Sequence, residues 1–315
     1  MLLRSIEICA GAGGQALGLE KAGFEHVALV EIDKPACDTL RHNRPKWKVI
    51  NTDVRSFSGK EYRGVELLAG GVPCPPFSAA GKQLGKDDER DLFPEALRLV
   101  SEIKPMAVML ENVRGLLSPK FESYRKTITQ KLLRLGYIAE WKLLNASDFG
   151  VPQLRPRVIC VGLRKEIHPY FKWPEPTTAS PKTVGDALHK LMAEDGWTGA
   201  SAWKEKASSV APTLVGGSKK HGGADLGPTR AKREWAKLGV DAMGLAEHPP
   251  GPNHKGMPRL TIKMAAAVQG FPNNWTFMGK KTPAYRQIGN AFPPPVAQAV
   301  GKEIAKAINA FNKAK

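Results

Sequence analysis

Short apolar runs alternate with amphipathic stretches along the first half of the chain. The apolar runs predict strands, and the amphipathic stretches predict helices over residues 14–22 and towards Asn43. The predicted strands are Ser5–Cys9, Val27–Glu31, Val49–Asn51, Glu66–Ala69, Ala107–Glu111 and Val158–Leu163. Because strands separated by helices form βαβ units, we expect an α/β fold with a doubly wound, mostly parallel sheet.

The second half of the chain has a different pattern. Prolines and small polar residues follow Trp173, and residues 204–263 are rich in Gly, Pro and charge with few strong helix or strand patterns. Regular patterning returns after Gly270, and Pro295–Phe311 predicts a closing helix. We therefore expect three parts: 1–188 for catalysis and cofactor binding, a smaller loop-rich domain at 189–275, and a segment at 276–315 that returns to the first part.

Charge narrows the class of partner. The 315 residues include 47 Lys+Arg against 30 Asp+Glu, a net charge of +17, and residues 204–263 alone carry a net +6. Such an excess favours a polyanion such as nucleic acid, although a merely basic enzyme also fits. The sequence has no apolar run of membrane-spanning length and no secretory signal, and its four scattered cysteines suit neither a disulfide framework nor a zinc site. We expect an intracellular protein without a metal.

A glycine-rich turn and two acids predict a nucleoside site. Gly11, Gly13 and Gly14 follow the first predicted strand and open a helix, where the backbone can approach a ligand closely. Glu31 ends the second strand, where a carboxylate can accept the ribose hydroxyls, and Asp53 follows the third. The turn lacks the full pyrophosphate loop, which favours a nucleoside without phosphates, such as S-adenosylmethionine, over a purely structural turn.

A cysteine between prolines follows the fourth predicted strand. Pro73 and Pro75 hold Cys74 in a rigid turn at the strand's carboxyl end, where ligands bind in open α/β sheets. A nucleophilic thiolate is one reading, and a buried inert cysteine is the other. The polar residues 81–91 that follow predict a loop that closes over a substrate, or else a solvated surface loop.

A carboxylate and two arginines complete the candidate chemistry. Glu111 ends the fifth predicted strand, where it suits a general acid or a helix N-terminal charge. Arg155 and Arg157 alternate before a later strand, so both guanidinium groups are expected on one face. Such a pair suits a substrate phosphate or a base carbonyl, and the alternative is two surface salt bridges.

The order of these motifs strongly resembles that of the DNA (cytosine-5) methyltransferases, in the compact form found in bacterial restriction–modification systems. The resemblance runs from Ile6 to Gly301. The residues that carry it are Gly11-x-Gly13-Gly14, Glu31, Asp53, Pro73-Cys74, Glu111-Asn112-Val113, Gln153-x-Arg155-x-Arg157, Gln269-Gly270-Phe271-Pro272 and Gln287-Ile288-Gly289-Asn290. The fold it implies is a Rossmann-like methyltransferase sheet with a target-recognition domain.

The resemblance also implies roles for individual residues. Cys74 would attack C6 of a cytosine flipped out of the duplex, Glu111 would act at N3, and Arg157 with Arg155 would hold the base. The closing helix would pack back on the first strand. The residues implied to bind S-adenosylmethionine, whose product is S-adenosylhomocysteine, are Cys9, Ala10, Gly11, Gly13, Gly14, Glu31, Ile32, Asp53, Val54, Pro73, Leu92, Asn290, Ala291 and Phe292. Cys9 stands where the family usually has an adenine-stacking Phe.

The implied partner is double-stranded DNA, and Thr213-Leu214 followed by Gly216-Gly217 looks like an element of a target-recognition domain. Candidate DNA contacts are Ser78, Lys82, Gln83, Arg90, Thr213, Leu214, Gly216, Gly217, Lys219, Lys220, Arg230 and Arg233. An RNA (tRNA) methyltransferase and a non-catalytic nucleic-acid-binding relative are the alternatives. We further expect a cytoplasmic monomer, beside a restriction endonuclease, with no membrane contact.

Overall fold

The computed structural model describes residues 2–73, 91–216 and 223–314. Several predicted site residues lie outside the described residues: Cys74, Ser78, Lys82, Gln83, Arg90, Gly217, Lys219 and Lys220. Within the described ranges, no helix is both long and apolar enough to cross a membrane.

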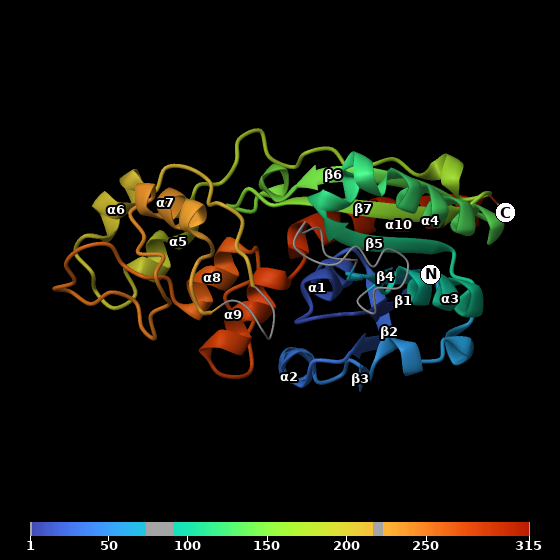
Figure 1. Cartoon of the computed structure of the whole chain (residues 1–315), viewed down its shortest axis with the longest axis horizontal. Helices are drawn as coiled ribbons and strands as arrows, with labels where there is room; N and C mark the ends of the chain where they lie inside the picture. Colours follow the sequence, from blue (N-terminus) through green and yellow to red (C-terminus); the bar gives the residue numbers. More distant parts are fainter. Residues whose placement is uncertain (1, 74–90, 217–222, 315) are drawn as a thin grey trace.

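A seven-stranded sheet occupies one half of the elongated molecule, on the right in Figure 1, with strand order β3-β2-β1-β4-β5-β7-β6. Its strands are β1 (Leu3–Ile8), β2 (Phe24–Glu31), β3 (Val49–Asn51), β4 (Leu67–Gly70), β5 (Ala107–Val113), β6 (Tyr137–Asn145) and β7 (Pro156–Arg164). The first five strands pair in parallel, and β7 runs antiparallel to both of its neighbours. The order reverses direction at β1, so the carboxyl ends of β1 and β4 flank the point where ligands bind in such sheets.

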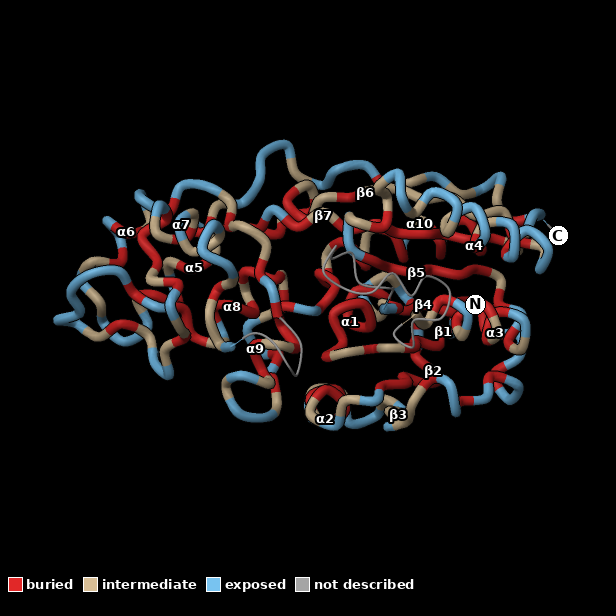
Figure 2. The backbone as a smooth tube through the Cα atoms, in the orientation of Figure 1, coloured by how far each residue is buried: buried red, intermediate tan, exposed pale blue. Residues whose placement is uncertain are grey.

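Alternate residues of the central strands enter two different cores, as the period of a strand requires. Ala69 and Met109 pack on one face with helix α10 (Pro294–Lys313), whereas Leu68 and Leu110 pack on the other with helix α3 (Phe93–Ile103). The remaining helices beside the sheet are α1 (Gly14–Lys21), α2 (Lys34–Asn43) and α4 (Glu122–Arg134). The residues of the central strands β1, β4 and β5 are buried except for Arg4 and Val113 near two strand ends, as Figure 2 shows.

The closing helix packs back on the N-terminal part of the chain. Helix α10 packs mainly on α1, and it shares a hydrophobic core with Leu3 of β1. A Cβ on Gly18 would lie 2.5 Å from the Cβ of Ala297, and one on Gly301 would lie 2.8 Å from Leu19. The two helices come this close because glycine stands at both positions.

The region expected to be loop-rich contains several helices. They are α6 (Ala200–Lys206), α7 (Thr229–Lys237) and α8 (Ile262–Val268); α5 (Val184–Met192) overlaps the start of this region and α9 (Lys281–Asn290) follows it. Leu188, Trp203 and Trp235 belong to a core shared by these helices. Helices α5, α6 and α7 lie away from the sheet (Figure 1), and long irregular segments connect them.

Candidate active site at the carboxyl edge of the sheet

A pocket of about 680 Å³ opens at the carboxyl ends of β1, β2 and β4. The predicted cofactor residues that line it are Cys9, Ala10, Gly11, Gly14, Glu31, Ile32, Asp53, Val54, Pro73, Leu92, Asn290, Ala291 and Phe292. Residues from the N-terminal and C-terminal parts of the chain thus line the same cavity. Its volume is usual for a small-molecule site.

The turn after β1 brings the backbone to this pocket. Gly11 and Gly13 have φ of 54° and 87°, and Cys9 adopts a left-handed φ of 51° although it carries a side chain. A Cβ on Gly14 would lie 2.2 Å from the Phe292 carbonyl oxygen, so this glycine allows the C-terminal segment to close the pocket. Gly13 does not line the pocket: it packs against Leu40 and Trp275.

Two predicted acids stand on one side of the pocket. The Glu31 carboxylate accepts hydrogen bonds of 2.7 Å from the N–H groups of Gly11 and Asp33, while its burial raises its pKa. Asp53 caps a short 3₁₀ helix by accepting from the N–H of Arg55 at 2.9 Å. Each carboxylate oxygen can accept more than one hydrogen bond, so both groups keep capacity for a ligand.

Pro73 and Leu92, which lie on either side of residues 74–91 in the sequence, are both at the pocket. The N–H of Leu92 donates to the carbonyl oxygen of Pro73 at 3.1 Å, and both residues line the pocket. Cys74 directly follows Pro73 in the sequence, and it lies outside the described residues. The two residues that stand on either side of the cysteine segment in the sequence are therefore part of the pocket wall.

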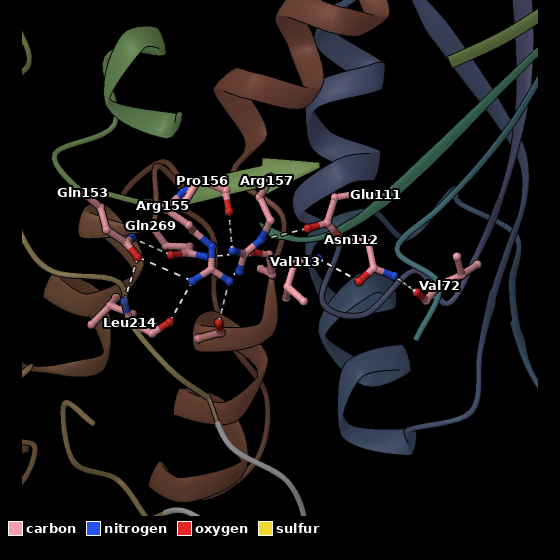
Figure 3. Close-up of polar contacts among 12 residues, drawn as sticks. Val72, Glu111, Asn112, Val113, Gln153, Arg155, Pro156, Arg157, Leu214 and Gln269 are labelled. Carbon is pink, nitrogen blue, oxygen red and sulfur yellow. Dashed lines mark hydrogen bonds and ion pairs between the residues drawn. The ribbon is translucent and has the colours of Figure 1, made fainter. Parts of the chain in front are cut away.

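Glu111 pairs with Arg157 beside the pocket. Glu111 lies near the end of β5, two residues before Val113, and lines the pocket, and its Oε1 lies 2.8 Å from Nε of Arg157 on β7. Both side chains are 11% exposed, so this is a buried ion pair, not a surface salt bridge. Burial raises the pKa of Glu111 even though Arg157 and Arg155 act in the opposite direction. The next residue, Asn112, donates to the Val72 carbonyl at 2.8 Å and ties β5 to the cysteine turn (Figure 3).

Arg155 has a different environment from the one expected. It is 1% exposed, does not line the pocket, and donates to the carbonyl oxygens of Leu214, Gly289 and Ala291 at 2.7, 2.7 and 3.0 Å. Burial and the nearby Arg157 lower its pKa. The interpretation as a surface salt bridge is wrong because the side chain is buried, and its direct contact with a base stays a prediction.

The predicted DNA contacts that the structure describes fall into two groups. Leu214 and Gly216 are buried, and the Thr213 hydroxyl donates to the Leu154 carbonyl oxygen. Arg230 and Arg233, on α7, are exposed, and no ion pair joins either to another residue within the described ranges. The two arginines are available to a phosphate, whereas the first group serves packing in this structure.

Sequence reasoning missed several pocket residues. Glu7 lines the pocket, is 1% exposed and leaves its Oε2 without a hydrogen-bond partner, and burial raises its pKa well above the ordinary value. Gln15 and Arg286 also line the pocket. The available signal for Glu7 was a charged residue between Ile6 and Ile8 of the first strand. Among the described residues, no group of three or more metal-ligating side chains comes together.

The fold and site define a class of protein, and comparison with known sequences identifies it. A sequence model of the family described as C-5 cytosine-specific DNA methylase matches residues 3–306, so the chain belongs to this family. The protein is a DNA (cytosine-5) methyltransferase.

Its relatives include bacterial enzymes of restriction–modification type. The chain is 59% identical to the Type II methyltransferase M.NgoMIV of Neisseria gonorrhoeae, over 99% of this chain and 100% of the relative. It is 60% identical to M.NaeI of Lentzea aerocolonigenes, over 98% of this chain and 76% of the relative. The fold is also that of the S. pombe Dnmt2 methyltransferase structure, with a TM-score of 0.64, 18% identity and coverage of 98% and 99%.

Proposed function

We propose that the chain transfers a methyl group from S-adenosylmethionine to C5 of a cytosine flipped out of a short, specific duplex DNA sequence, with Cys74 as the nucleophile. The observation that carries this proposal is the buried Glu111–Arg157 pair at the rim of a pocket lined by Glu31 and Asp53. One cavity thus joins a candidate proton donor to a candidate nucleoside site.

The pocket residues fit S-adenosylmethionine. The pocket lining includes the acids Glu7, Glu31 and Asp53, which suit a cationic ligand that carries ribose hydroxyls. The unpartnered Glu7 Oε2 offers hydrogen-bonding capacity for such a ligand, and the space beside Gly11, where a Cβ would meet nothing within 4 Å, offers room. The bound cofactor would supply an activated methyl group, and a metal is not part of the proposal.

The chain's own residues would supply the remaining chemistry. The Cys74 thiolate would add to C6 of the cytosine, and the Glu111 carboxylate, whose pKa burial raises, would take up a proton and deliver it to N3. Arg157 would hold Glu111 and the base edge in register through the 2.8 Å ion pair. Together they would stabilise the negative charge that develops on the ring when the Cys74–C6 bond forms. Loss of the C5 proton and expulsion of Cys74 would complete the turnover.

The target-recognition role is assigned to residues 189–275, between catalytic parts at 1–188 and 276–315. The exposed Arg230 and Arg233 support contacts between this region and DNA phosphates. Binding of the DNA must also supply the few kcal/mol, in order of magnitude, that flipping the target base out of the stack costs. The names of the Type II methyltransferase relatives support a restriction–modification role, and we propose that the chain acts as a monomer in the bacterial cytoplasm beside a restriction endonuclease.

Methyl incorporation with labelled cofactor tests the proposal. The protein is incubated with S-adenosylmethionine carrying a labelled methyl group and with duplex DNA or tRNA, and Cys74→Ala serves as the matched variant. We expect label in DNA as 5-methylcytosine, none in tRNA, and none with Cys74→Ala. Label only in tRNA would overturn the duplex DNA substrate, and full transfer by Cys74→Ala would overturn the covalent route.

A further inference from the structure

Residues 211–214, within the proposed target-recognition region, are hydrogen-bonded to residues 152–154, just before β7. Ala211 pairs with Gln153 in an isolated parallel bridge, with hydrogen bonds of 2.8 Å from the Leu154 N–H to the Ala211 carbonyl and 2.9 Å from the Ala211 N–H to the Pro152 carbonyl. The Thr213 hydroxyl also donates to the Leu154 carbonyl. Residues 211–214 therefore follow the backbone just before β7.

The same segment then meets the cofactor wall through two glycines. A Cβ on Gly289 would lie 2.3 Å from the Gly216 nitrogen, and a Cβ on Gly216 would lie 2.4 Å from the Arg286 carbonyl oxygen and 2.7 Å from Oδ1 of Asn290. Arg286 and Asn290 line the pocket, whereas Gly216 does not. The two backbones touch here with no space for even a methyl group.

Buried polar side chains join both sides of this contact. Arg155 donates to Leu214 on one side and to Gly289 and Ala291 on the other (Figure 3). Gln153, which is fully buried, accepts from the Leu214 N–H at 2.8 Å and donates to Gln269 at 2.7 Å. Because removal of such a group leaves buried carbonyls unsatisfied, these side chains hold the two backbones in one arrangement.

We propose that residues 211–216 and 289–291 form a seam, fixed by Arg155, through which the target-recognition segment and the cofactor pocket position one another. Arg155 is then a positioning residue, because it acts through the backbone of Leu214 and Ala291 and not on the substrate. The inference rests on the proposed function of the pocket. Coupling of this kind is reciprocal: whatever the cofactor contributes to DNA affinity, DNA contributes equally to cofactor affinity.

A glycine substitution outside the pocket tests the seam. S-adenosylhomocysteine binding without DNA is measured by calorimetry for the parent, for Gly216→Ala and for Gly223→Ala. Gly223 lies on the other side of the same segment, and a Cβ there meets nothing within 4 Å. We expect about tenfold weaker binding for Gly216→Ala, since overpacking at Arg286 and Asn290 distorts the pocket, and no change for Gly223→Ala.

A second variant, Arg155→Lys, tests the seam independently of Gly216→Ala. It separates the positive charge of Arg155 from its hydrogen bonds to several carbonyl groups. Arg155→Lys keeps the cation but not the planar fork that reaches several carbonyls. The seam predicts weaker S-adenosylhomocysteine binding without DNA, together with a smaller effect of the cofactor on DNA affinity. Parent-like affinity without DNA for both Arg155→Lys and Gly216→Ala would overturn the seam. Failure of the parent itself to bind S-adenosylhomocysteine would instead overturn the proposed cofactor site.

Discussion

Glu111→Gln is the substitution that bears most sharply on the chemistry. Glutamine keeps the shape of the side chain but removes the carboxylate charge that pairs with Arg157, 2.8 Å away, and it cannot take up and deliver a proton. Loss of general acid catalysis lowers a rate by about 10²–10⁴-fold. Removal of one partner of a buried ion pair also destabilises the fold, by about 3–5 kcal/mol, because the other charge stays buried and unpaired.

The two effects can be measured separately. Single-turnover methyl transfer is followed well below the melting temperature, with thermal unfolding and S-adenosylhomocysteine affinity recorded for each variant. Glu66→Gln is the control: Glu66 is buried and pairs at 3.1 Å with Arg4, whose side chain is 48% exposed, and it directly precedes β4 at the amino-terminal end of that strand, outside the pocket lining. The reasoning is refuted if folded Glu111→Gln transfers methyl groups within tenfold of folded Glu66→Gln.

Two further predictions concern charge. DNA affinity should fall steeply with salt, and Arg230→Ala and Arg233→Ala should each reduce the log–log slope by about 0.9 without altering sequence preference; an unchanged slope in both variants would exclude them from the phosphate footprint. His26 is buried against Ser5 and Ala16, and desolvation lowers its pKa. The unfolded chain therefore binds the extra proton first, so stability should fall as pH drops below about 6.5, and His26→Gln should flatten that fall in melting experiments; an identical pH profile would contradict it.

The sheet could be predicted where strands are apolar on both faces. Strands β1, β2, β4, β5 and β7 are buried and read as apolar runs, with ends within a few residues of the prediction. Strand β6 was missed because it lies at the edge of the sheet and mixes Glu140 and Lys142 with apolar residues, so its pattern does not read as a buried strand. Its partly exposed positions explain why only the structure reveals it.

The candidate site could be predicted where motif residues supply side-chain chemistry. Glu31, Asp53 and Glu111 all line the pocket, as the ends of parallel strands require. The surroundings of Arg155 could not be predicted, because its acceptors are backbone carbonyls that every sequence has. The close contact of Gly216 with Gly289 was equally hidden, since the two residues are far apart in the sequence and neither has a side chain to signal a role.

The central claim is that Cys74 bonds covalently to the target cytosine. For the most direct test, the protein is reacted with S-adenosylmethionine and a cognate duplex in which 5-fluorocytosine replaces the target, and its mass is then measured. Release of Cys74 requires loss of the C5 proton, and the fluorine that replaces this proton cannot be removed by a base, so the covalent adduct persists. The account predicts a stable adduct of protein and methylated DNA that maps to Cys74 and is absent in Cys74→Ala. Methyl transfer to an ordinary cognate duplex, with no adduct on the fluorinated one, would contradict it.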